Sequence, residues 1–249
     1  MYKYFFIVGA QRSGTTFLYT LLDKHPQIQM ARPVRPEPKF FLKEEEYTLG
    51  TDFYNKTYYP EIKEGALWLG EKSTGYYETP QVAERIHGFF PEAKIVFLLR
   101  NPVDRALSNY FFSVQHGLET RSLADAFLNK VEAPKQTQFT SVNPFDYINR
   151  SKYSGYLADY NRFFKGNVIT MISEELFTDK SVLTDFFGLL GVNNYDVFEN
   201  MKQKVNQSEL PEGTSLEGIE EVRIALRKEL SAEIGLIEEW LGRKIPSWE

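Results

Sequence analysis

Two glycines near the N-terminus have the spacing of a phosphate-binding loop, in the segment Gly9-Ala10-Gln11-Arg12-Ser13-Gly14-Thr15-Thr16. An apolar run before it, residues 4–8, predicts a strand, and residues 15–25 carry apolar side chains at helical spacing. In this order, backbone N–H groups of the turn and of the helix N-terminus can face one anion together. An ordinary tight turn is the alternative. Spacing and context together favour a phosphate site.

The same segment differs from the loop of nucleotide triphosphatases. Thr15 stands where those enzymes need a lysine, and the cation of this loop is Arg12. A second apolar run, residues 94–99, is followed by Arg100 and not by an acidic Mg²⁺ ligand. The three histidines lack metal-ligand spacing. These features predict a phosphate bound without a metal and disfavour a P-loop kinase, which remains an alternative.

The glycine loop is one of two motifs that point to a known family. The run from Gln11 to Thr16, with His25-Pro26 after it, resembles the 5′-phosphosulfate loop of sulfotransferases that use 3′-phosphoadenosine 5′-phosphosulfate (PAPS). The run from Arg100 to Tyr110 is similar to the 3′-phosphate motif of that family. The nearest branch holds the heparan sulfate sulfotransferases and bacterial carbohydrate or natural-product enzymes. The resemblance implies PAPS as donor, adenosine 3′,5′-bisphosphate as product, and no metal.

The resemblance also implies which residues bind the nucleotide. Arg100 and Ser108 are expected to hold the 3′-phosphate, and a planar guanidinium after a central strand suits that role. The alternative pairs Arg100 with Asp104 and leaves Ser108 facing solvent. Tyr153 is expected to shape the nucleotide site, and Lys204 is a further candidate. The residues assigned to the 5′-phosphosulfate group are Gln11, Arg12, Ser13, Gly14, Thr15 and Thr16.

Three residues are candidates for catalysis, because transfer to a hydroxyl needs a base and cations around the transferring group. Glu37 resembles the general base of the family, although Pro36 replaces a usual lysine and Lys39 stands where histidine is frequent. Lys72 resembles the lysine that reaches the active centre, and Arg12 is expected to stabilise the leaving group. Without the resemblance, Glu37 reads as a solvated residue in a proline-rich loop and Lys72 as a surface lysine in a turn.

Alternating strands and helices predict a three-layer α/β fold of the P-loop type, with a central parallel sheet flanked by helices. We expect one sulfotransferase domain over residues 1–249. Residues 132–149 are expected to form a long loop that shapes the acceptor pocket together with residues 42–66. Strands are expected at 4–8, 67–70, 94–99 and 168–172, and helices at 15–25, 80–89, 102–117, 151–164, 180–190 and 217–241.

The composition is that of a globular protein, with 42% hydrophobic and 25% charged residues among 249. Global disorder is therefore excluded, and the absence of cysteine excludes disulfides and thiolate chemistry. A formal charge of −5 argues against nucleic acid as a partner. No apolar run has the length of a membrane span or of a secretory signal, so the expected location is the cytoplasm.

The acceptor hydroxyl is left open by the sequence. A small molecule, glycan, lipid, polyketide β-hydroxyl or peptide tyrosine is compatible with the motifs. Aromatic residues make up 15% of the chain, and we expect rings at Phe40–Phe41, Tyr76–Tyr77 and Tyr110–Phe112 to wall the ligand pockets. A protein that binds the nucleotide without catalysing transfer is the remaining alternative.

Overall fold

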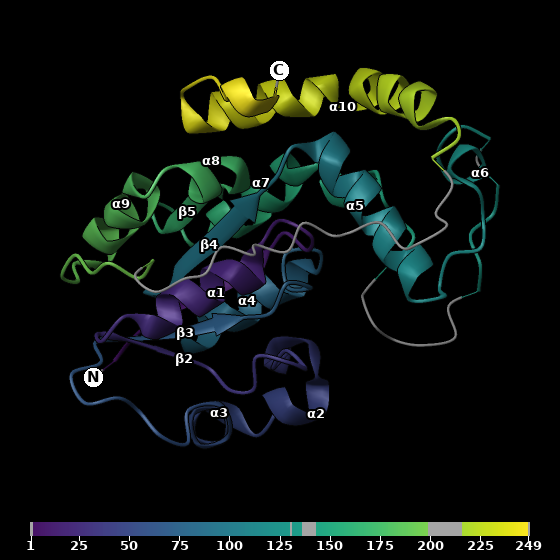
Figure 1. Cartoon of the computed structure of the whole chain (residues 1–249). Helices are drawn as coiled ribbons and strands as arrows, with labels where there is room; N and C mark the ends of the chain where they lie inside the picture. The colour runs from purple at the N-terminus through teal and green to yellow at the C-terminus, as the bar shows by residue number, and fades with distance from the viewer. Residues whose placement is uncertain (1, 130, 136–142, 199–215, 249) are drawn as a thin grey trace. The chain divides into compact units, whose positions relative to one another are not determined.

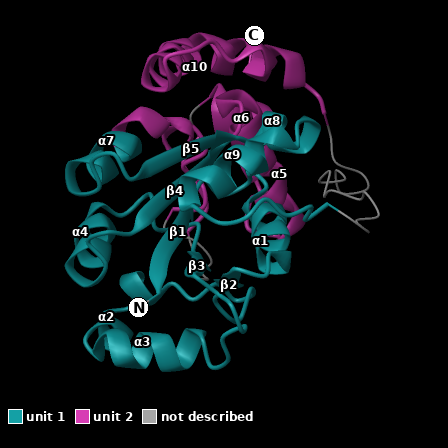
Figure 2. Ribbon diagram, turned by 90° about the vertical axis from the view of Figure 1, so that its left-hand side faces the viewer, with its two compact units in different colours: residues 1–99, 156–205 teal, residues 100–155, 206–249 magenta. Residues whose placement is uncertain are grey.

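The computed structural model describes residues 2–129, 131–135, 143–198 and 216–248 (Figure 1). The chain forms two compact units, residues 1–99 with 156–205 and residues 100–155 with 206–249, which are coloured separately in Figure 2. The candidate Lys204 lies outside the described residues. Each unit is described by itself.

A five-stranded parallel sheet forms the centre of the first unit, in the order β2-β3-β1-β4-β5. All neighbouring strands run parallel, so their carboxyl ends share one edge of the sheet. The predicted α/β fold with a parallel sheet is confirmed. The strands are β1 (Lys3–Gly9), β2 (Ile28–Met30), β3 (Trp68–Lys72), β4 (Lys94–Leu99) and β5 (Val168–Ile172).

Helices cover both faces of this sheet, as Figure 2 shows within the first unit. Helices α1 (Thr15–Lys24), α8 (Ser173–Thr178) and α9 (Ser181–Leu190) pack with the strand face that carries Phe5 and Ile7. Helices α4 (Pro80–Phe89) and α7 (Tyr153–Phe163) belong to the opposite layer, where Tyr160 meets Phe97 edge-on at 5.4 Å between ring centroids. Burial of each such large side chain contributes about 1.5–3 kcal/mol.

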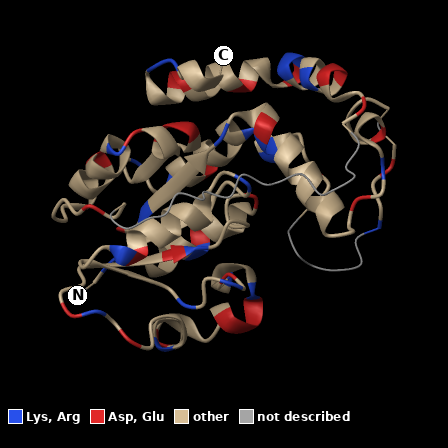
Figure 3. Cartoon of the chain, viewed as in Figure 1, with Lys and Arg blue, Asp and Glu red and all other residues tan. Residues whose placement is uncertain are grey.

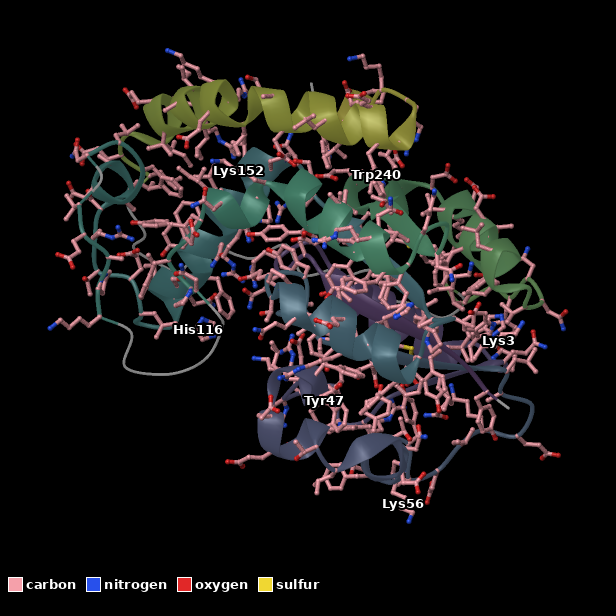
Figure 4. The ribbon with its side chains drawn as sticks, turned by 180° about the vertical axis from the view of Figure 1, so that it is seen from behind. Lys3, Tyr47, Lys56, His116, Lys152 and Trp240 are labelled. Atoms are coloured by element: carbon pink, nitrogen blue, oxygen red, sulfur yellow. The ribbon has the colours of Figure 1, made fainter. Side chains whose placement is uncertain are left out.

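The connection from β2 to β3 holds η1 (Phe40–Leu42), α2 (Glu44–Tyr47) and α3 (Gly50–Tyr58). Phe40 and Phe41 are fully buried here, and the centroid of the Phe41 ring lies 5.6 Å from that of Phe6 in β1. The Tyr47 ring stacks on Phe89 of α4 at 4.8 Å, and Figure 4 labels Tyr47 within this region. These rings anchor the connection to the sheet, and Phe40 and Phe41 do not form the expected pocket wall.

Helix α2 begins with three glutamates, Glu44 to Glu46, which form a compact acidic group in Figure 3. Carboxylates in the first turn favour helix formation because they face the positive end of the helix dipole. Glu44 also pairs with Arg85 of α4, and Glu46 accepts a hydrogen bond from Tyr58 of α3. The connection between β2 and β3 is therefore tied to its neighbours by polar contacts as well as by rings.

The second unit has its own core, built around α5 (Pro102–Gln115), α6 (Leu123–Phe127) and α10 (Ile219–Leu241). Two short turns, η2 (Asn149–Ser151) and η3 (Pro246–Trp248), complete it. The fully buried Arg105 of α5 donates to Ser151 Oγ and to the Tyr147 carbonyl, each at 2.7 Å. The helix expected at 151–164 begins instead at Tyr153, because the turn η2 occupies residues 149–151.

Candidate active site

The glycine loop connects the carboxyl end of β1 to the N-terminus of α1. Its start is fixed by the Ala10 N–H, which donates to the Leu98 carbonyl of β4 at 2.9 Å. Gly14 has φ +86°, and a Cβ there would lie 2.8 Å from the Phe177 ring. A Cβ on Gly9 would lie 2.5 Å from the Tyr77 ring. Both glycines are therefore required by close neighbours, and Gly14 also by its left-handed backbone.

The N-terminus of α1 has the local features of an anion site. Gly14 occupies the N-cap position without a side-chain cap, and the first turn has no acidic residue. The first N–H groups of a helix lack carbonyl partners within it, and the helix dipole adds positive potential. Ser13 Oγ is buried and has no hydrogen-bond partner among the described residues. This end of α1 can accept an anion such as a phosphate.

Lys72 is the last residue of β3, and its side chain is only 3% exposed. Its Nζ donates to Glu37 Oε1 at 2.7 Å and lies 3.5 Å from Thr16 Oγ1 at the start of α1. The interpretation of Lys72 as a surface lysine is therefore wrong. The ammonium group stands between the candidate base and the candidate phosphate loop.

Glu37 is held by two groups of Thr74 in addition to the lysine. Its Oε2 accepts from the Thr74 N–H at 3.0 Å, and Thr74 Oγ1 lies 3.0 and 3.1 Å from the two carboxylate oxygens. The Glu37 side chain is 16% exposed, so solvent still reaches it. It is therefore not the fully solvated loop residue of the alternative interpretation. A fixed carboxylate that remains accessible has the properties of a general base.

The contribution of Thr74 was missed by the sequence analysis, although Thr74 lies in the Gly70–Tyr77 motif. One of its contacts is made by a backbone N–H, and residue type does not encode such a contact. Glu71, in the same motif, is fully buried and was given no role. An acidic residue directly after the apolar run Leu67–Gly70 was the available signal, since buried acids require hydrogen-bond donors.

Arg100, Ser108 and Tyr153 all belong to the second unit. Asn101 caps α5 by accepting from the Val103 N–H at 3.0 Å, which fixes the backbone just after Arg100. The Tyr153 hydroxyl donates to the Arg100 carbonyl at 2.9 Å, so Tyr153 supports the backbone that carries the guanidinium. Tyr153 is fully buried.

The alternative interpretation of Ser108 as a solvent-facing residue does not agree with the structure. Ser108 is 6% exposed and does not face solvent. The Asp104 carboxylate accepts from Arg223 of α10 at 2.8 Å. The role of Arg100 and Ser108 in binding a 3′-phosphate stays a prediction.

The described residues lack two kinds of feature. They contain no group of three histidine, cysteine, aspartate or glutamate side chains arranged to hold a metal ion. Within the same part of the chain, no helix combines the length and apolar character that crossing a bilayer requires.

A model of the sulfotransferase domain matches residues 3–231. The chain therefore belongs to the sulfotransferase domain family, which agrees with the resemblance of the two motifs. The match includes the glycine loop, Glu37, Lys72 and the Arg100–Tyr110 motif.

Curated relatives and a solved structure support this assignment. The chain is 28% identical to the human bifunctional heparan sulfate N-deacetylase/N-sulfotransferase 2 over 77% of its length and 22% of that protein. It is 28% identical to the mouse heparan sulfate glucosamine 3-O-sulfotransferase 6 over 74% of its length and 51% of that protein. It thus spans a fifth to a half of these relatives. A crystal structure of a sulfotransferase from Alicyclobacillus acidocaldarius superposes with a TM-score of 0.75 at 25% identity, covering 100% of this chain and 98% of that one.

Proposed function

We propose that this member of the sulfotransferase family transfers a sulfuryl group from PAPS to a hydroxyl of a carbohydrate, releasing adenosine 3′,5′-bisphosphate. The observation that carries the proposal is the position of Lys72 Nζ, 2.7 Å from Glu37 Oε1 and 3.5 Å from Thr16 Oγ1. Three separate segments thereby place a carboxylate, a cation and a helix N-terminus together. The three are a base, a charge stabiliser and an anion site, which sulfuryl transfer to a hydroxyl requires.

The residues present fit PAPS as a donor. The uncapped N-terminus of α1, free of acids, suits the 5′-phosphosulfate group. We propose that the residues from Gln11 to Thr16 hold that group, that Arg100 and Ser108 hold the 3′-phosphate, and that Tyr153 supports Arg100. PAPS supplies the sulfuryl group already bonded to a phosphate that can leave. A guanidinium and a hydroxyl provide the donors that a phosphate accepts.

The chemistry of the chain follows from these positions. Glu37 accepts the proton of the acceptor hydroxyl as its oxygen bonds to sulfur, while the bond from sulfur to the 5′-phosphate oxygen breaks and that oxygen keeps the electron pair. Lys72 stabilises the negative charge on the transferring group, and Arg12 stabilises the charge on the leaving phosphate. Thr74 holds the Glu37 carboxylate so that it need not reorganise during the reaction. No step requires a metal.

The carbohydrate acceptor is inferred from the relatives. Two of them are named for heparan sulfate, and one of these for 3-O-sulfation. The connection between β2 and β3 carries Glu37, so we propose that this segment lines the acceptor site. Lipid, polyketide and tyrosine hydroxyls are the competing acceptors that the experiment below distinguishes. The cytoplasmic location expected from the sequence remains a prediction.

The decisive experiment uses ³⁵S-labelled PAPS with glycan, lipid, polyketide and peptide acceptors in separate reactions. We expect label on glycan hydroxyls with the wild-type protein and transfer reduced at least about 10²-fold in Glu37→Gln. Calorimetry should show the same affinity for adenosine 3′,5′-bisphosphate in both proteins. Phosphate transfer from Mg-ATP would instead identify a kinase. Nucleotide binding without transfer to any acceptor would identify a non-catalytic protein of this family.

A further inference from the structure

Glu71 is a fully buried carboxyl group next to Lys72 in β3, and the proposed mechanism does not use it. Tyr54 donates to its Oε2 and Ser73 donates to its Oε1, each at 2.6 Å. Tyr76 makes a third side-chain hydrogen bond to it. Burial raises the pKa of Glu71, and the hydroxyl donors oppose that shift. Burial of this carboxyl group is therefore unfavourable by itself, and the three hydroxyl donors offset part of that cost.

Two of these hydroxyls connect Glu71 to the segment that follows Glu37. The Lys39 N–H donates to Ser73 Oγ at 2.9 Å, and the Phe41 N–H donates to the Tyr76 hydroxyl at 3.2 Å. A backbone N–H is always the donor, so each hydroxyl accepts on one side and gives its own proton to the carboxyl group on the other. Glu71 is the terminal acceptor of two relays that begin on the backbone of residues 39–41.

The side chains of Glu71 and Lys72 make two separate sets of contacts. Consecutive residues of a strand point to opposite faces. Lys72 reaches Glu37 and Thr16, whereas Glu71 reaches Tyr54 and Tyr76. The end of β3 therefore holds the segment around Glu37 in two ways. Lys72 bonds to the Glu37 carboxylate, and Glu71 acts through Ser73 and Tyr76 on the backbone of residues 39 and 41.

We propose that Glu71 is a positioning residue, which fixes the backbone of residues 39–41 through the hydroxyls of Ser73 and Tyr76 and so holds Glu37 at its distance from Lys72 and the phosphate loop. This inference rests on the proposed function for its effect on catalysis. The relays themselves are a property of the fold and are tested without a substrate.

The variant that tests the relays is Glu71→Gln. An amide has one acceptor oxygen and one donor NH₂ group, so three hydroxyl donors can no longer all be satisfied. Tyr54→Phe is the matched control, since it removes a buried hydroxyl bonded to the same carboxyl group but leaves both relays intact. We expect amide hydrogen exchange in a peptide spanning residues 38–42 to accelerate at least tenfold in Glu71→Gln and to stay within about threefold of wild type in Tyr54→Phe.

Kinetics supply the second readout. We expect Glu71→Gln to lower kcat by about 10- to 100-fold, because a misplacement near 1 Å has effects of this size, with KM for PAPS and affinity for adenosine 3′,5′-bisphosphate unchanged. If Glu71→Gln does not fold, Ser73→Ala cuts one relay and should give a smaller effect of the same kind. Unchanged exchange at residues 38–42, or equal effects of Glu71→Gln and Tyr54→Phe, overturns the proposal. Accelerated exchange in a protein that transfers no sulfate supports the relays and overturns the proposed function instead.

Discussion

The contact between Lys72 and Glu37 allows a quantitative prediction. Lys72→Met removes the cation and leaves the Glu37 carboxylate in a site that is 16% exposed. Removal of one partner from a buried ion pair costs about 3–5 kcal/mol. The bonds from Thr74 and the residual solvent access of Glu37 reduce this, so we expect a loss of about 2–3 kcal/mol in the free energy of unfolding. Glu37→Gln should cost a similar amount, because it leaves an ammonium group that is 3% exposed without its carboxylate.

The double variant Lys72→Met/Glu37→Gln separates pairing from general damage. If the two side chains act as a pair, the double variant loses less stability than the sum of the single variants, by about 1–2 kcal/mol. Urea denaturation measures all four proteins. Lys56→Met is the control for the substitution itself, since Lys56 is exposed and is labelled at the outer side of α3 in Figure 4. It should change stability by less than about 0.5 kcal/mol.

The same variants report on catalysis. We expect Lys72→Met to lower sulfate transfer by about 10²–10³-fold, the usual effect of losing one group that stabilises developing charge. If the stability losses of the two single variants sum to that of the double variant within about 0.5 kcal/mol, the pairing argument is refuted. Transfer at the wild-type rate in Lys72→Met would refute the catalytic role.

Three further predictions follow from individual residues. Gly14→Ala should destabilise the protein by more than Gly50→Ala. Both positions have positive φ, and placing an alanine there costs about 1 kcal/mol, but of the two only Gly14 has a neighbour, the Phe177 ring, that a Cβ would meet. Equal melting temperatures for the two variants would contradict this. Arg100→Ala should weaken binding of adenosine 3′,5′-bisphosphate by about 10- to 100-fold in calorimetry while leaving binding of adenosine 5′-phosphate unchanged, and a parallel loss for both nucleotides would show that Arg100 does not recognise the 3′-phosphate. His25 accepts from the Gln27 N–H and contacts the Asn193 carbonyl, and burial lowers its pKa from 6.5. Its contribution to stability is therefore present above pH 6.5 and is lost as pH falls below that value. Denaturation at several pH values should show that the stability of His25→Gln falls less steeply than that of the wild-type protein between about pH 6.5 and 5.

Much of the sheet was predictable from the sequence because its longer strands are rich in apolar residues. β4 and β5 have the expected bounds, as does α4, which starts at the predicted Pro80. A continuous apolar run and an N-terminal proline are local signals and need no knowledge of neighbours. β2 was missed because three residues, Ile28 to Met30, carry too short a pattern.

The candidate site was predictable as a set of residues but not as an arrangement. Glu37 and Lys72 were selected by motif, and their pairing at 2.7 Å is information that only the fold contains. Thr74 and Ser73 act on groups 37 and 34 positions away, through a backbone N–H and a relayed hydroxyl. Such contacts depend on how the β2–β3 connection crosses the end of β3, which neither hydrophobic periodicity nor residue type encodes.

The buried hydrogen bonds around Glu71 have a consequence for changing acceptor specificity by exchanging segments between relatives. The connection from β2 to β3 has the form of a replaceable insertion, since it leaves the sheet at residue 30 and returns at residue 68. However, Tyr54 and the backbone of residues 39–41 lie within it, whereas Glu71, Ser73 and Tyr76 lie beyond its end. A graft that stops at β3 would separate donors from their acceptor. The smallest unit that can be transplanted intact therefore runs through Tyr76, and recombination boundaries should be placed after it.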